Sequence, residues 1–176
     1  MDRRDFLKTV AVSGAAMTIQ RSEAMEILTQ AVNSTGKPDL VAVMGDEPEL
    51  MFQRAIAELG GMKQFVKSGQ KVVVKPNIGW DKVPELAGNT NPKLVAEIVK
   101  QCFAAGAKEV TVFDHTCDDW QKCYKNSGIE SAAKAAGAKV MPAHLESYYR
   151  PVDLSKGKNM KKAKIHEAIL NCDVWI

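Results

Sequence analysis

The chain has 176 residues, enough for one domain or most of one, and its 45% hydrophobic and 26% charged residues are ordinary for a globular protein. A net charge of +3 is too small to indicate a nucleic-acid-binding protein. The apolar run at residues 9–19 is too short to cross a bilayer as a stable helix. We therefore expect no nucleic acid partner and no stable membrane span.

Residues 1–24 carry the features of an export signal. Arg3 and Arg4 open the sequence R-R-D-F-L-K, which follows the pattern of a twin-arginine signal. The apolar run 9–19 follows it, and small residues at Ser22-Glu23-Ala24 stand at a plausible cleavage spacing. The stretch predicts a twin-arginine signal peptide, the twin-arginine translocation machinery as a partner, and a periplasmic or otherwise exported protein. The alternative is a basic N-terminal helix that is not a signal.

The chain after the signal reads as a linker followed by an α/β domain. Residues 25–37 are polar and poorly patterned, and we interpret them as the linker, with the domain covering 38–176. The apolar run 39–45 is bounded by turn formers and predicts a strand, and residues 48–59 predict a helix. The β-branched run 71–75 is typical of a strand buried on both faces.

The rest of the domain continues this alternation. Asn91 is a good N-cap and Pro92 suits the first helical position, so a helix begins there. Polar and basic residues 144–164 predict an excursion over the surface. The other expected elements are helices at 119–126 and 129–136 and strands at 109–113, 139–141 and 172–176. Because 172–176 reads as the opening of a buried strand, we expect the domain to continue beyond Ile176.

Alternating strands and helices predict the fold class. Helices between apolar strands imply right-handed parallel crossovers. The sequence therefore predicts an open, mainly parallel α/β sheet with helices on both faces, incomplete at its C-terminus.

In such a sheet, ligands bind outside the carboxyl ends of the strands. This rule selects candidate site residues that follow the predicted strands or precede a helix: Lys75, Asn77, Thr90, Asn91, Asp114, His115, His144 and Glu146. A cation such as Lys75 beside a helix N-terminus makes a site for a phosphate or carboxylate. The alternative is that Lys75 pairs with Asp114 and only fixes the geometry of the loop.

Carboxylate, imidazole and thiol groups gather in residues 114–119, and such donors suit zinc or iron. The irregular spacing equally fits a solvated loop with a helix-capping Asp. None of the four cysteines forms a C-x-x-C pair, so the motifs of a zinc ribbon and of a ferredoxin-type cluster are absent from this sequence. Cys117 and Cys123 could form a disulfide after export. The metal ligands and the identity of any metal are not predicted.

Several short motifs resemble those of a known family, the domain of unknown function numbered 362. They are K-P-N at 75–77, T-N-P at 90–92, A-G-A-K-E-V-T-V at 105–112, S-G-I-E at 127–130 and the strand at 172–176. The resemblance covers roughly residues 39–176. It implies an α/β domain that is sometimes attached to iron–sulfur cluster segments and has no settled reaction.

Two functional hypotheses follow. The first is an exported redox enzyme associated with a metal or an iron–sulfur cluster, in which Lys75 and the helix N-terminus hold an anionic group. Asp114 or His115 would then act as base or ligand, and the cofactor would belong to the full-length protein. The second is a non-catalytic binding or assembly protein for a small anionic ligand or a partner.

Overall fold

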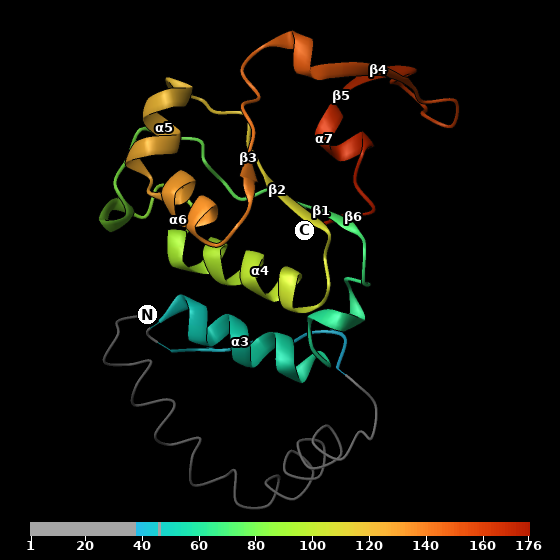
Figure 1. The fold of residues 1–176 in the computed structure, drawn as a ribbon. Helices are drawn as coiled ribbons and strands as arrows, with labels where there is room; N and C mark the ends of the chain where they lie inside the picture. The colour runs from blue at the N-terminus through green and yellow to red at the C-terminus, as the bar shows by residue number, and fades with distance from the viewer. Residues whose placement is uncertain (1–37, 46) are drawn as a thin grey trace, which may run out of the picture. The chain divides into compact units, whose positions relative to one another are not determined.

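A four-stranded parallel sheet in the order β3-β2-β1-β6 forms the centre of the fold (Figure 1). The computed structural model describes residues 38–45 and 47–176, so the predicted signal peptide and the predicted linker both lie outside the described residues. The strands are β1 (Lys71–Val74), β2 (Glu109–Val112), β3 (Lys139–Val140) and β6 (Val174–Trp175). Val72 of β1 lies opposite Val110 on one side and Val174 on the other.

One face of the sheet is covered by a layer of three helices, α3, α4 and α6, with α4 in the middle (Figure 1). Val72 and Val74 point into this layer, because alternate residues of a strand face opposite sides. They share one buried core with Val95 and Val99 of α4. The helices are α3 (Pro48–Glu58), α4 (Pro92–Ala104), α5 (Trp120–Asn126), α6 (Ile129–Ala135) and α7 (Glu167–Leu170).

The second face carries the short helix α7 and an antiparallel hairpin. Val73 points to this side and packs with Phe113 and Ala168. The hairpin is formed by β4 (Tyr149–Asp153) and β5 (Lys162–His166). Single 3-10 turns lie at Met62–Gln64, Pro84–Leu86 and Glu146–Tyr148. The predicted open α/β sheet with helices on both faces is confirmed.

Most predicted elements lie within one or two residues of their expected positions, but the strand at 39–45 is wrong. These residues form no strand and pair with no strand in the part of the chain that the structure describes. Leu40 and Met44 are 84% and 97% exposed. An apolar run is not sufficient for a strand, because its backbone groups also need a neighbouring strand to pair with.

The segment 144–164 runs over the surface as expected, but most of it belongs to a two-stranded sheet, ending at His166, that the sequence did not indicate. Its register places Tyr149 opposite His166 and Asp153 opposite Lys162. Within the described residues, no helix has the length and apolar character needed to cross a membrane.

Candidate anion-binding site

Lys75 and Asp114 meet at the carboxyl edge of the sheet. Lys75 follows β1 directly, and Asp114 comes two residues after the neighbouring strand β2. The Nζ atom of Lys75 lies 2.5 Å from Oδ1 of Asp114. The side chain of Lys75 is 48% exposed, whereas that of Asp114 is only 6% exposed. The ion pair that the sequence offered as an alternative is therefore present, and its cation faces solvent.

Asp114 is held from several directions. Its Oδ2 atom accepts a hydrogen bond from the backbone N–H of Ile78 at 2.7 Å. Its backbone N–H donates to the hydroxyl oxygen of Tyr124 at 2.8 Å. The hydroxyl of Tyr124 in turn faces the carbonyl oxygens of Asp114 and Met141, at 2.8 and 3.0 Å. Because both carboxylate oxygens are engaged, Asp114 positions the ammonium group of Lys75.

Tyr124 was not among the residues selected from the sequence. It is buried in α5, and burial raises the pKa of its hydroxyl from 10.0 to about 12. The phenol therefore stays protonated and remains a donor at any physiological pH. The sequence contained only one signal for this role of Tyr124, namely a tyrosine in a short predicted helix next to the predicted sheet edge.

Asn77 and Thr90 close the loop between β1 and α4. The N–H of Asn77 donates to the hydroxyl of Thr90 at 2.9 Å, and the N–H of Thr90 donates to the carbonyl of Asn77 at 3.0 Å. The side chain of Asn77 also donates to the carbonyl of Gly88 at 3.0 Å. These contacts hold the start of α4 close to the end of β1.

Asn91 caps α4 as predicted. Its side-chain oxygen accepts a hydrogen bond from the N–H of Lys93 at 2.9 Å, and Pro92 occupies the first helical position. Pro92 has no N–H and that of Lys93 is already bonded. The N-terminus of α4 therefore attracts an anion mainly through the positive end of the helix dipole, and less through unpaired N–H donors.

The other predicted residues lie around the hairpin. His115 is exposed, and its ring centroid lies 6.3 Å from that of Tyr149. The ring of His144 stacks on Trp120 at 4.5 Å, with the two planes 6° apart. Glu146 is exposed and pairs with Lys164 of β5. The structure thus brings Lys75 and Asp114 into contact, but gives His144 a partner in α5 and Glu146 a partner in the hairpin.

His166 is a buried histidine that the sequence analysis did not select. It is 2% exposed and stacks on Phe113 with the ring centroids 4.1 Å apart. Its Nδ1 atom accepts from the N–H of Ala168 at 3.1 Å, which leaves Nε2 to donate to the carbonyl of Pro142 at 3.1 Å. Both ring nitrogens are satisfied, so His166 joins the hairpin to the sheet.

The described residues contain no group of three or more His, Cys, Asp or Glu side chains placed to hold a metal ion. All four cysteines are free thiols, and burial raises the pKa of Cys102 to about 11. Cys117 and Cys123 are not bonded to each other; the Sγ atom of Cys123 contacts the carbonyl of Gly79 at 3.6 Å. The four cysteines, as the described structure places them, do not fit the ligand set of an iron–sulfur cluster.

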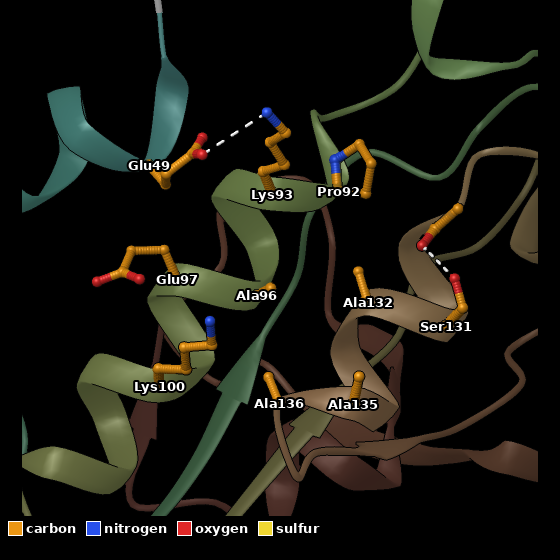
Figure 2. A pocket seen from close by; sticks show the side chains of 11 residues that line it. Glu49, Pro92, Lys93, Ala96, Glu97, Lys100, Ser131, Ala132, Ala135 and Ala136 are labelled. Carbon is orange, nitrogen blue, oxygen red and sulfur yellow. Dashed lines mark hydrogen bonds and ion pairs between the residues drawn. The ribbon is translucent and has the colours of Figure 1, made fainter.

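A groove of about 580 Å³ lies between α4 and α6 and reaches Pro92 at the start of α4, but none of the predicted site residues lines it (Figure 2). Small side chains line most of it, including Ala96, Ala132 and Ala136. Glu49 of α3 and Lys93 of α4 contact each other at one end, at 3.7 Å. The groove contains none of the chemistry gathered around Lys75.

The fold is that of an open α/β protein, and at the carboxyl edge of its sheet a lysine that follows a strand pairs with a buried, hydrogen-bonded carboxylate. The family model described as Domain of unknown function (DUF362) matches residues 72–176, and the chain belongs to this family. No curated protein and no solved structure is significantly similar to the chain.

Proposed function

We propose that this protein binds a small anionic ligand, a carboxylate or a phosphate, at the carboxyl edge of its sheet, with Lys75 as the charged contact. The observation that carries the proposal is the half-exposed Lys75 ammonium held against the buried carboxylate of Asp114. Such a cation is oriented before any ligand arrives, so binding loses little side-chain entropy.

The ammonium group has donors to spare. It carries three N–H bonds, and within the described residues Asp114 is its one ion-pair partner. The loop bonds of Asn77 and Thr90 place the positive end of the α4 dipole on the same edge. Lys75, Asn77, Thr90 and Asn91 are therefore the proposed ligand-binding residues.

Asp114 and His115 differ in what they could contribute to catalysis. Both oxygens of Asp114 are engaged, so we assign it the role of positioning Lys75. His115 is exposed beside Tyr149, and it is the residue that we propose as a base or ligand. A redox role with a metal or iron–sulfur cluster would need ligands beyond those that the described residues bring together.

Export is part of the same proposal. The R-R-D-F-L-K sequence and the apolar run after it support delivery through the twin-arginine route to the periplasm or another exported location. The ligand would then be one that the protein meets outside the cytoplasm.

Calorimetric titration of the full chain with inorganic phosphate and with acetate tests the binding proposal. Lys75→Met should weaken binding at least tenfold, because it removes the charged donor. Lys134→Met is the matched control, since Lys134 is also an exposed lysine that pairs with one carboxylate, that of Glu130 at 2.6 Å. Equal affinities in the two variants, or no heat with either anion, would contradict the proposal.

A further inference from the structure

The edge of β6 that faces away from β1 is unpartnered within the described residues and apolar. Within the described residues β6 pairs only with β1, and Trp175 is 69% exposed. A groove of about 380 Å³ lies beneath this edge and is lined by apolar side chains alone, among them Phe52, Met62 and Phe65. An open strand edge above an apolar groove is a surface suited to one further strand.

Residues 39–45 have the composition of such a strand and belong to no sheet in this structure. The run contains Val41 and Val43, and only residues 46 and 47 separate it from α3. A connection of this length is usual between a strand and the helix that follows it.

The direction of residues 39–45 also fits. Lys93 in the first turn of α4 pairs with Glu47 at 2.8 Å, which places the start of α3 beside the start of α4. Because α4 starts at the carboxyl edge of the sheet, residues 39–45 end at that edge, as a parallel strand must. Figure 1 shows this segment running alongside α3 in the opposite direction to the helix.

The handedness of the crossovers decides the side of the sheet. Helices α3 and α4 contribute to the same buried core, so they cover the same face. Two right-handed crossovers over one face step across the sheet in the same direction. The step from β1 to β2 leads away from β6, so the strand before α3 lies on the β6 side of β1. The place next to β1 is occupied by β6, and the next position is its free edge.

We propose that the free edge of β6 and the apolar groove beneath it form a docking surface for a parallel strand, and that residues 39–45, which pair with no strand in the arrangement described above, occupy it in a second arrangement of the same chain. The sheet then has the order β3-β2-β1-β6 followed by 39–45. The inference does not depend on the anion-binding proposal.

Nuclear magnetic resonance on the full chain tests the docking directly. Nuclear Overhauser contacts between residues 41–43 and 174–176, with slow hydrogen exchange at the N–H of Trp175, are the expected result. Coil-like chemical shifts for 39–45 with fast exchange at Trp175 would overturn the proposal. Contacts of 39–45 with β3, or contacts between chains in a mixed-label sample, would also overturn it.

A variant pair separates docking from general destabilisation. Val41→Asp combined with Val43→Asp should raise the exchange rate at Trp175 at least tenfold, while the amides of β2 keep their protection. Ser155→Asp with Asn159→Asp adds the same charge to exposed positions of the hairpin loop and should leave Trp175 protected. Equal exchange at Trp175 in the two variants would contradict docking.

Discussion

Tyr124 supports the candidate site without facing solvent, because its hydroxyl contacts the backbone of both Asp114 and Met141. Tyr124→Phe should lower the free energy of unfolding by about 1–3 kcal/mol, since it leaves a buried N–H and two carbonyls without this partner. Urea denaturation measures the change. Tyr148→Phe is the control, because the Tyr148 hydroxyl makes no hydrogen bond within the described residues, and it should cost far less. Equal costs would show that the Tyr124 contacts contribute little.

Two buried groups should make the fold sensitive to alkali. Burial raises the pKa of Cys102 from 9.0 to about 11 and that of Tyr124 from 10.0 to about 12. Between about pH 9 and 12 the unfolded chain loses these protons while the folded chain keeps them, so the free energy of unfolding falls as pH rises. Urea denaturation at pH 8 and pH 10.5 measures the loss, and the fall should be less steep in Cys102→Ala. A stability that is unchanged or higher at pH 10.5 would contradict the prediction.

Helix α4 begins where the loop after β1 ends, at the carboxyl edge of the sheet. Its N-terminal cap, Asn91, can be tested directly. Asn91→Ala removes the side-chain acceptor of the Lys93 N–H and should lower the free energy of unfolding by about 1 kcal/mol. Thermal unfolding followed by circular dichroism measures it. Asn159→Ala, at an exposed position of the hairpin loop, should have little effect. No difference between the two variants would mean that Asn91 does not stabilise α4.

The sequence predicted those elements whose periodicity and end signals agree. Val72 to Val74 and the Asn91-Pro92 start gave β1 and α4 nearly to the residue. The predicted strand at 39–45 is absent from the structure because a strand needs a neighbouring strand to pair with. The pattern of apolar residues within the run does not show which strand that neighbour would be. The hairpin was missed because Lys162 and Lys164, which dominate β5, signal exposure rather than pairing.

The residues of the candidate site also divide into those that the sequence predicts and those that it does not. Lys75 and Asp114 could be predicted because both follow strands of one parallel sheet, whose carboxyl ends meet at one edge. Tyr124 and His166 could not be predicted, because their roles depend on tertiary contacts with backbone groups far along the chain. Side-chain bonds to distant backbone atoms leave no periodic trace in a sequence.

For the whole molecule, the first residues of the chain predict export. Replacing both arginines, Arg3→Lys with Arg4→Lys, should abolish export of the full chain through the twin-arginine route while leaving its synthesis unchanged. Cell fractionation followed by immunoblotting measures the distribution. The control is Arg21→Lys, which lies outside the R-R-D-F-L-K sequence. Export of the double variant at the level of the original chain would contradict the signal.

The central claim is that Lys75 and the start of α4 bind an anion. Titration of the full, ¹⁵N-labelled chain with inorganic phosphate, followed by amide chemical shifts, tests it most directly. The predicted result is saturable shifts concentrated at Lys75, Asn77, Thr90 and Asn91, which disappear in Lys75→Met. Shifts spread over the exposed lysines of the hairpin, or shifts that persist in Lys75→Met, would contradict the claim.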